Sequence, residues 1–279
     1  MTGLLAERAV LITGAGNGIG REHALACARA GARVVVNDLG GARDGSGGSE
    51  TAAEAVVAEI RAMGGDAVAN GDSVTDPAGC ARMVAAATER WGRLDCVVNN
   101  AGILRDRSFV KMSDEEWSTV LAVHLDGTRN VIKAALPALL VAGGSIINTT
   151  SISGMLGNNF GQSNYGAAKA GIYGLTRVLA VELARSRITV NAIAPIAKTR
   201  MTAELERVEA SWGPERVAPL VVYLASDLSR HVTGRIFGVK GNRIHAYVVQ
   251  VNEGVDKPGP DAWTAEEIAA RFDEIVAFP

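Results

Sequence analysis

Short runs of apolar, β-branched residues alternate along this chain with longer alanine-rich stretches whose apolar positions recur at helical spacing. The runs are almost continuously apolar, so both faces of each predicted strand must be buried, which is typical of parallel strands covered by helices. We find seven such runs, and they predict a doubly wound α/β fold with a seven-stranded parallel sheet and helices on both faces. The runs read RAVLIT, ARVVVND, DAVAN, LDCVVNN, GSIINTT, RITVNAIA and RIFGV.

The stretches between the runs are amphipathic and predict the covering helices, at 18–30, 49–63, 77–91, 113–140, 165–185 and 215–226. A glycine-rich loop at 40–49 interrupts the alternation after the second strand and is too polar to belong to a core. The sequence shows neither an internal repeat nor a second domain. We therefore expect one domain over residues 1–279, with a C-terminal helical extension at 260–279.

A Pro/Gly loop at 252–264 leads into that extension. Thr264 and Glu267 have capping-box spacing, which predicts that a helix begins there. This helix, at 264–278, would carry an apolar stripe that needs a partner surface, formed by Ile268, Phe272, Ile275 and Val276. We expect it to pack on the body of the protein or across a subunit contact.

The composition limits the classes of function. A formal net charge of −2 does not favour binding to nucleic acid or to an anionic membrane. Cys27, Cys80 and Cys96 form an odd count without metal-ligand spacing, so we expect neither a disulfide framework nor a metal site. There is no apolar run of the roughly 18 residues that a membrane span needs, no signal-peptide pattern and no C-terminal peroxisomal address. We expect a cytoplasmic protein.

The first strand runs into the sequence TGAGNGIG and from there directly into a helix. Glycines let the backbone turn tightly and approach a phosphate, which the N–H groups and the dipole of the helix N-terminus then stabilise. A strand, a glycine-rich turn and a helix in this order predict a dinucleotide site and, with it, a Rossmann fold. The expected cofactor-binding residues of the turn are Gly14, Asn17, Gly18, Ile19 and Gly20.

Residues at the ends of later strands extend this site. Asp38 lies 18 residues beyond Gly20, about where an acid bonds the adenosine ribose and repels the 2′-phosphate of NADP, so NAD is the expected cofactor. Arg43 in the following loop would oppose that preference. The other expected contacts are Asp72 and Ser73 at the adenine, and Asn99, Ala101 and Gly102 beneath the nicotinamide, although Asp38 and Asp72 are also compatible with solvated strand ends.

Tyr165 and Lys169 lie four residues apart in SNYGAAKAG, on one face of a predicted helix. An ammonium beside a phenol favours the phenolate and lowers the tyrosine pKa from about 10. A tyrosine shifted in this way can accept a proton from an alcohol. The alternative is an ordinary surface pair, and the rest of the sequence must decide.

Taken together, these motifs resemble the short-chain dehydrogenase/reductase family. They are Gly14-x-x-x-Gly18-x-Gly20, Asn99-Asn100-Ala101-Gly102, Ser151 and Tyr165-x-x-x-Lys169. VVVNDLGG, NNAGILRDRSF, NFGQSNY and the tail WTAEEIAARFDEIVAF are similar to its (3R)-hydroxyacyl-CoA dehydrogenase branch, which includes a unit of the peroxisomal multifunctional enzymes of type 2. The resemblance implies hydride transfer between NAD and a secondary alcohol, a (3R)-hydroxyacyl-CoA, in a homodimer or homotetramer.

The resemblance also implies roles for single residues. Tyr165 would accept the hydroxyl proton, Lys169 would lower its pKa and bond the nicotinamide ribose, and Ser151 would hold the substrate oxygen. His124 stands where the family usually has an asparagine that orders a water for proton relay, and a packed structural histidine is the alternative.

Two more departures from the family pattern leave questions open. Ser151 lies 14 residues before Tyr165 where the family usually shows 13, so Ser153 remains a second candidate for the catalytic serine. Pro195 is followed by Ile196 instead of glycine, and we still expect both at the carboxamide of the cofactor.

The substrate is the least determined part of the prediction. A short segment after the sixth strand, at 199–213, predicts an open cleft, where Lys198 and Arg200 could meet the phosphates of CoA. The alternatives are a 17β-hydroxysteroid dehydrogenase, a 3-oxoacyl carrier-protein reductase, and a non-catalytic dinucleotide-sensing module.

Overall fold

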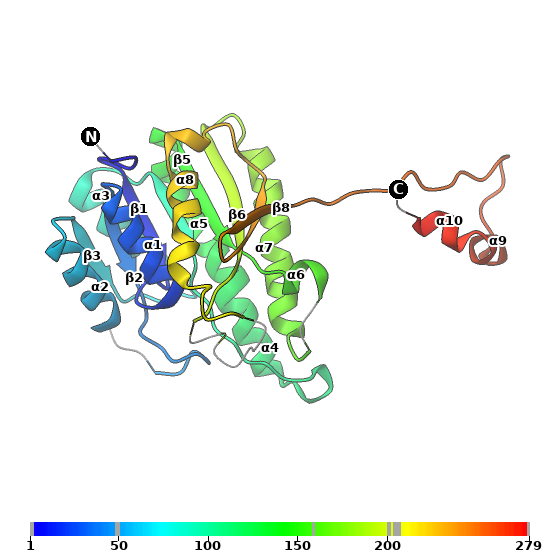
Figure 1. The fold of residues 1–279 in the computed structure, drawn as a ribbon, viewed down its shortest axis with the longest axis horizontal. Coiled ribbons are helices and arrows are strands. Elements are labelled where there is room, and N and C mark those ends of the chain that lie inside the picture. Colours follow the sequence, from blue (N-terminus) through cyan, green and yellow to red (C-terminus); the bar gives the residue numbers. More distant parts are fainter. Residues whose placement is uncertain (1–2, 48–50, 158–159, 200–201, 203–207, 278–279) are drawn as a thin grey trace. The chain divides into compact units, whose positions relative to one another are not determined.

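The sheet at the centre of the protein has eight strands, in the order β3-β2-β1-β4-β5-β6-β7-β8 (Figure 1). The computed structural model describes residues 3–47, 51–157, 160–199, 202 and 208–277, and the chain divides into two compact units at 1–246 and 247–279. The strands are β1 (Ala9–Thr13), β2 (Arg33–Asn37), β3 (Ala67–Asn70), β4 (Cys96–Asn99), β5 (Gly144–Thr149), β6 (Ile188–Ile196), β7 (Ile236–Lys240) and β8 (Arg243–Tyr247). The predicted doubly wound α/β fold is confirmed, with β1 to β7 parallel.

The predicted count of seven strands was one too low. Only Gly241 and Asn242 separate β7 from β8, so β8 must return antiparallel, because a parallel connection needs a dozen or more residues. Its residues, RIHAY, are exposed or half-buried. A search for continuous apolar runs could not find such an edge strand.

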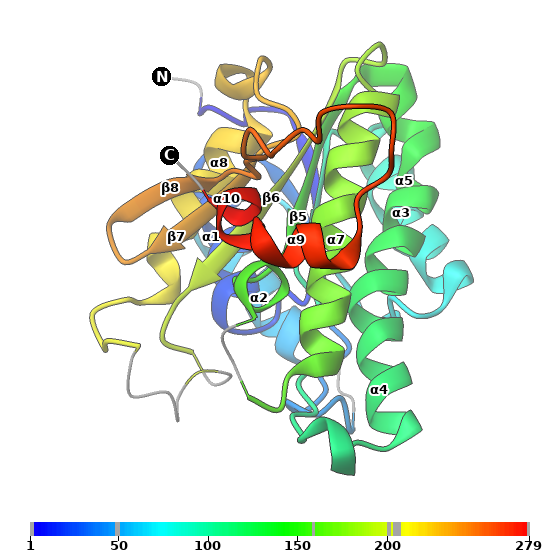
Figure 2. The ribbon, with the colours of Figure 1, turned by 90° about the vertical axis from the view of Figure 1, so that its right-hand side faces the viewer.

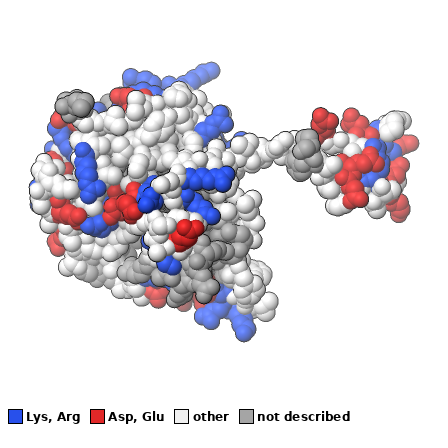
Figure 3. Space-filling model, viewed as in Figure 1, with Lys and Arg blue, Asp and Glu red and all other residues white. Residues whose placement is uncertain are grey.

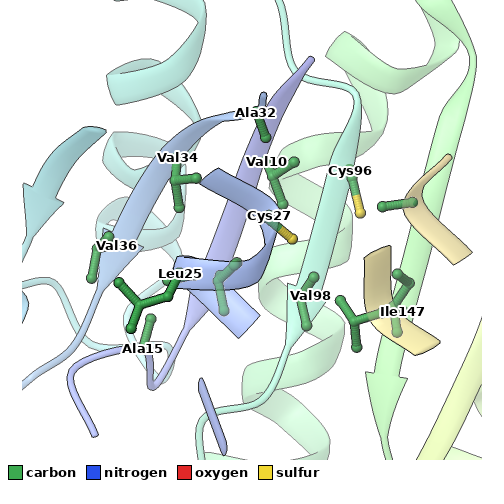
Figure 4. Packing of buried hydrophobic residues seen from close by; sticks show 14 of the residues in the cluster. Val10, Ala15, Leu25, Cys27, Ala32, Val34, Val36, Cys96, Val98 and Ile147 are labelled. Carbon is green, nitrogen blue, oxygen red and sulfur yellow. The ribbon is translucent and has the colours of Figure 1, made fainter. Parts of the chain in front are cut away.

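Alternate side chains of each strand enter two different cores. Val10 and Ile12 of β1 point into a core under α1, α2 and α8, whereas Ala9 and Leu11 point into a core under α3, α5 and α7. Figure 4 shows the first core, and Figure 2 shows α5 and α7 covering the opposite face from α1 and α8. These helices are α1 (Gly18–Arg29), α2 (Thr51–Ala62), α3 (Pro77–Trp91), α5 (Gly127–Ala142), α7 (Ser163–Glu182) and α8 (Ala218–Ala225).

The long helix predicted at 113–140 is interrupted. It begins as α4 (Asp114–Leu121), passes through a π-helical turn labelled η2 (Ala122–Asp126), and continues as α5. A π turn inserts an extra residue and is frequent at functional sites, and here it carries His124 into the interior. The shorter elements are α6 (Ser153–Leu156), η1 (Phe109–Lys111), η4 (Pro214–Arg216) and η5 (Asp227–Ser229).

The helix predicted at 264–278 is two short helices in the C-terminal unit, α9 (Ala265–Ala270) and α10 (Phe272–Val276), because Arg271 leaves helical geometry at φ −113° and ψ 15°. The Thr264–Glu267 capping box is confirmed. Asn252 donates hydrogen bonds to the carbonyls of Ile275 and Ala277, which closes this unit on itself. Its residues 247–279 include seven acidic and two basic side chains. Figure 3 shows acidic side chains over this unit.

All three cysteines are buried in the larger unit and none forms a disulfide. Burial raises the pKa of Cys27 to about 12 and that of Cys80 to about 11, so both thiols stay protonated. Within the described ranges no helix is both long and apolar enough to cross a membrane.

Candidate active site

A cavity of about 470 Å³ opens at the carboxyl ends of the strands. It lies over β1 and β4, where the strand order reverses direction, and doubly wound sheets bind their ligands at this point. Loops after β1, β2, β3, β4, β5 and β6 all reach it, so residues far apart in sequence meet there. The predicted residues that line it are Gly14, Asn17, Gly18, Ile19, Gly20, Asp38, Asp72, Ser73, Ala101, Gly102, His124, Ser151, Ser153, Tyr165, Lys169, Pro195 and Ile196.

The glycines between β1 and α1 serve two purposes: two of them allow close packing of the backbone, and one leaves space at the helix N-terminus. A Cβ on Gly20 would lie 2.0 Å from the carbonyl oxygen of Gly14, and a Cβ on Gly14 would lie 2.8 Å from Cα of Ala101. These two positions therefore permit close packing of strand, turn and helix. Gly18 has φ +53° and nothing nearer than 3.8 Å to its missing Cβ, so it leaves open space at the N-terminus of α1. That space suits a phosphate.

Asp38, at the end of β2, accepts hydrogen bonds from the backbone N–H of Gly16 and of Gly40, both at 2.7 Å. Its carboxylate thus joins the glycine turn to the loop that follows β2, and it remains on the cavity wall. Asp72 accepts from Arg82 and Asn70, and the Arg82 guanidinium is the largest influence that lowers the pKa of Asp72. Both acids therefore tie neighbouring segments together by hydrogen bonds and also line the cavity.

Asn99, expected beneath the nicotinamide, is not among the residues that line this cavity. Its side chain is 4% exposed and donates a 2.9 Å hydrogen bond to Asn148 in the core. Asn100 lines the cavity instead, and its side chain donates to the carbonyls of Thr13 and Gly14, which fixes the glycine turn. The alternation of β4 could have shown this, because Val98 faces α1 and α8 and its neighbour must face the other side.

The first turn of α7 places Tyr165 on the cavity wall. Asn164 is fully buried, and its amide donates to the carbonyls of Arg105 and Glu116 while its oxygen accepts from the backbone N–H of Tyr165. One turn later, Lys169 is 3% exposed and donates a 2.5 Å hydrogen bond to the carbonyl of Thr149 at the end of β5. Asn164 is a positioning residue that the sequence analysis missed, although it lies inside the SNYGAAKAG motif.

The expectation that Lys169 lowers the pKa of Tyr165 was wrong, since the pKa of Tyr165 is raised in this structure. Desolvation dominates and raises the pKa of Tyr165 to about 12, while a hydrogen bond from Ser151 opposes the rise. Burial also lowers the pKa of Lys169 to about 7, and its Nζ lies 5.6 Å from the centre of the tyrosine ring. The ammonium is directed at Thr149 and burial disfavours its charge, so its effect on the phenol is weak. Sequence spacing does not reveal how deeply either group is buried.

The two candidate serines have different partners. Ser151 shares a hydrogen bond with the Tyr165 side chain, and its Oγ also accepts from the backbone N–H of Ser153. Ser153 donates its own hydroxyl to Gln162, whose amide in turn donates to Asp106. Ser151 is thus the serine at the phenol, and Ser153 supports the loop that holds it. Gln162 and Asp106 also line the cavity, and no sequence signal had singled them out.

His124 packs edge-on against Tyr165, with ring centres 5.2 Å apart. Its Nε2 lies 2.8 Å from the carbonyl oxygen and 3.2 Å from the backbone nitrogen of Ile103. The shorter distance favours a proton on Nε2, which leaves Nδ1 as an acceptor, and Nδ1 has no hydrogen-bond partner among the described residues. Burial lowers the pKa of His124 to about 3, so the ring is neutral. Gly102 makes room for it, since a Cβ there would lie 2.3 Å from the ring.

The segment expected to border the substrate is described only in part. Ala197, Thr199, Thr202 and Val208 line the cavity, and the backbone N–H of Lys198 donates to the carbonyl of Trp212. Arg200 lies outside the described residues.

Known oxidoreductases resemble this chain over most of its length. Residues 14–241 match the family model described as enoyl-(acyl carrier protein) reductase. A short-chain type dehydrogenase/reductase of Mycobacterium tuberculosis is 46% identical over 272 residues, 96% of this chain and 94% of that protein. The mouse peroxisomal multifunctional enzyme type 2 is 50% identical over 235 residues, 83% of this chain but 31% of that protein, so this chain spans about a third of it. A 3-oxoacyl-[acyl-carrier-protein] reductase of Synechocystis is 41% identical over 255 residues, 88% of this chain and 99% of that protein.

Solved structures share the whole architecture. A short chain dehydrogenase from Mycobacterium avium has a TM-score of 0.86 and 46% identity, covering 99% of this chain and 98% of its own. Carveol dehydrogenase from the same species, in complex with NAD, has a TM-score of 0.78 and 29% identity, covering 86% of this chain and 98% of its own.

Proposed function

Because this chain belongs to the short-chain dehydrogenase/reductase family, we propose that it is an NAD-dependent dehydrogenase that converts (3R)-hydroxyacyl-CoA to 3-oxoacyl-CoA. One observation carries the proposal: the phenol of Tyr165, with Ser151 hydrogen-bonded to it, faces the same cavity as Asp38 and the glycine turn. A proton-transfer group and a dinucleotide cradle in one cavity are what the dehydrogenation of an alcohol requires.

The residues of the cavity fit NAD. Gly18 leaves open space where a Cβ would stand, at the N-terminus of α1, which suits the pyrophosphate. Asp38 stands at the end of β2 and favours a ribose with a free 2′-hydroxyl. When bound, NAD supplies the acceptor for the hydride that leaves the carbinol carbon. The NAD complex of carveol dehydrogenase supports this choice.

The protein's own groups handle the proton. Ser151 orients the substrate oxygen, and the Tyr165 oxygen accepts the hydroxyl proton as the carbonyl forms. In the reverse direction the same phenol donates that proton, and a pKa of about 12 keeps it protonated for this step at neutral pH. Lys169 is anchored on the carbonyl of Thr149, with its Nζ 5.6 Å from the centre of the tyrosine ring, and in this proposal it bonds the nicotinamide ribose.

The thioester substrate is supported by the relatives and by the mouth of the cavity. The mouse peroxisomal enzyme and the Synechocystis 3-oxoacyl-[acyl-carrier-protein] reductase both align over most of this chain. Lys198 directly follows the cavity residue Ala197, where a cation can meet the phosphates of CoA. A 3-oxoacyl carrier-protein reductase is the second candidate, because the Synechocystis relative is matched over its full length.

The decisive experiment compares (3R)-hydroxyacyl-CoA, its (3S) epimer and a 17β-hydroxysteroid at equal NAD. We expect the highest kcat/KM for the (3R) thioester. A tenfold lead of the steroid would replace the proposal with a hydroxysteroid dehydrogenase. In the direction of reduction, a higher kcat/KM for the carrier-protein thioester with NADPH than for the CoA thioester with NADH would favour the second candidate. No turnover on any of them, with NAD still bound, would favour a dinucleotide sensor.

The CoA contact has its own test. Lys198→Ala should raise KM for the CoA thioester several-fold and leave KM for the matching pantetheine thioester, which lacks the nucleotide phosphates, unchanged. Equal effects on both substrates would remove Lys198 from phosphate binding.

We also propose a cytoplasmic homodimer or homotetramer. Unpaired buried cysteines suit a reducing compartment. Exposed apolar side chains on α5 and α7 suit a subunit contact, among them Leu140, Val141, Val178 and Val181.

A further inference from the structure

The glycine-rich loop after β2 is folded into a compact turn. Within this loop, called here the strap (residues 40–47), the N–H of Ala42 donates to Ser46 and the N–H of Gly45 donates to Ala42. Asp44 accepts from both the backbone and the hydroxyl of Ser46. Gly41, Ala42, Arg43 and Gly45 line the cavity beside Asp38, so the strap forms its wall at the adenosine end.

The strap is tied to a segment that follows a different strand. This segment, called here the bridge (residues 103–105), follows β4. The N–H of Leu104 donates to the carbonyl of Arg43, and Nε of Arg105 donates to the carbonyl of Asp44, both at 3.0 Å. Gly45 lies against Ile103, since a Cβ there would come within 3.2 Å of its side chain.

The opposite side of the bridge holds the catalytic end. Ile103 is bonded to His124, and the carbonyl of Arg105 accepts from Asn164 at 3.1 Å. The Asn164 oxygen holds the backbone N–H of Tyr165 at 2.7 Å. The bridge is therefore bonded both to the wall at the adenosine end and to the residues that position the catalytic tyrosine.

We propose that Arg105 is a positioning residue that couples occupancy of the adenosine end of the cavity to the seating of Tyr165. Its side chain holds the strap and its carbonyl holds Asn164, so ordering the strap orders the start of α7. This inference rests on the proposed NAD site and deepens it. The path runs through hydrogen bonds between described residues, from the strap through Arg105 and Asn164 to Tyr165. Coupling of this kind is reciprocal, so ordering of the start of α7 would raise affinity at the adenosine end by the same factor.

The test uses ADP, which can fill the adenosine end but cannot reach Tyr165. Hydrogen exchange is measured with and without ADP for peptides that cover the strap, the bridge and residues 163–167. In the wild type we expect ADP to protect all three. In Arg105→Ala we expect protection of the strap to weaken and that of 163–167 to disappear, with a loss of NAD affinity of about fivefold, the size of one hydrogen bond.

Three further variants separate the contact from general damage. Arg107→Ala removes a neighbouring, exposed ion pair with Glu116, and Glu115→Gln removes the negative charge beside Arg105 without touching Asp44. Both should behave as wild type. Gly45→Ala disturbs the same contact from the strap side, where φ is +88°. The double variant Gly45→Ala with Arg105→Ala should therefore lose less NAD affinity than the product of the two single fold-losses.

The outcomes distinguish the two proposals. Wild-type protein that binds neither NAD nor ADP contradicts the proposed cofactor site. ADP that protects the strap and leaves 163–167 unchanged in the wild type contradicts the coupling, as does an Arg105→Ala protein with unchanged exchange and affinity.

Discussion

Tyr165 lies on the cavity wall, and burial raises its pKa to about 12. This raised pKa favours proton donation by the phenol over proton acceptance. The phenol is protonated at neutral pH, so donation to a ketone needs no prior ionisation, whereas acceptance from an alcohol requires the phenolate. Lys169 is neutral above its pKa of about 7 and helps the phenolate less as the pH rises. Substrate oxidation and ketone reduction should therefore depend differently on pH.

We expect the oxidation rate to rise as the pH is raised from 7 toward 10, because the phenolate fraction grows, while the reduction rate stays flat or falls. Initial rates in both directions at constant ionic strength would show this. Tyr165→Phe should lose turnover by several orders of magnitude while binding NAD as the wild type does. A variant that keeps more than a tenth of the rate would exclude Tyr165 as the proton-transfer group.

The two serines make a matched pair for mutation. Ser151→Ala removes the hydroxyl bonded to the tyrosine and should lower kcat by about a hundredfold or more, the usual effect of a lost oxyanion donor. Ser153→Ala removes a bond to Gln162 and should cost much less. A larger loss in the Ser153 variant would reverse the assignment.

His124 tests whether a packed ring or a polar contact matters. His124→Asn supplies an amide that can still donate to the carbonyl of Ile103 and should keep much of the activity. His124→Leu leaves the buried carbonyl of Ile103 without its donor and should destabilise the protein by about 1–3 kcal/mol as well as slow turnover. Melting temperatures and kcat for both variants decide, and wild-type behaviour of both would make the histidine a passive core residue.

Among the elements, the ends of the strands explain cofactor choice. Asp38 ties the glycine turn to the strap and faces the cavity, and Arg43 on the strap lines the same wall. The acid repels a 2′-phosphate and the arginine attracts one. We predict that Asp38 prevails.

NAD should bind at least about tenfold more tightly than NADP, a difference of about 1.4 kcal/mol. Calorimetric titration of each cofactor measures it. Arg43→Ala provides the control, since it should widen the preference for NAD. If the wild type binds both cofactors equally and Arg43→Ala prefers NAD, Arg43 offsets the effect of the acid.

The elements also show where sequence reasoning succeeds. Runs such as AVLIT and RVVVN are buried on both faces, and continuous burial leaves a continuous apolar pattern. The edge strand β8 has no such pattern because water covers much of it. The π turn at Ala122–Asp126 leaves no trace either, because its sequence is also compatible with an α-helix. The side chain of Asn99 lies in the core, as the alternation of β4 requires.

At the scale of the whole molecule, the glycine turn, the acid after β2 and the tyrosine–lysine pair were predictable as one cavity, because the carboxyl ends of parallel strands share an edge. Burial and its effect on the pKa of Tyr165 and Lys169 were not, since desolvation depends on every element that packs around them.

The C-terminal unit offers a prediction at this scale. Within it, Ile268, Phe272 and Val276 stay 42–55% exposed, which leaves an apolar stripe available for a partner surface. Truncation after Gly259 should lower the melting temperature or change the mass in solution, because we expect this stripe to pack on the body of the protein or across a subunit contact. Light scattering and thermal unfolding would measure both quantities. The double variant Ile268→Ser with Phe272→Ser should act like the truncation, and a truncated protein with unchanged mass and melting temperature would disprove the contact.

The burial of all three thiols has a practical consequence for spectroscopy. Because these thiols are buried and their pKa is raised, we expect none of them to react with maleimides in the folded protein. Ser46→Cys, a nearly isosteric change at an exposed point of the strap, would then create one reactive thiol. A fluorophore attached there would change its emission as dinucleotide enters the cavity, and would follow that step in real time without any change to the catalytic residues.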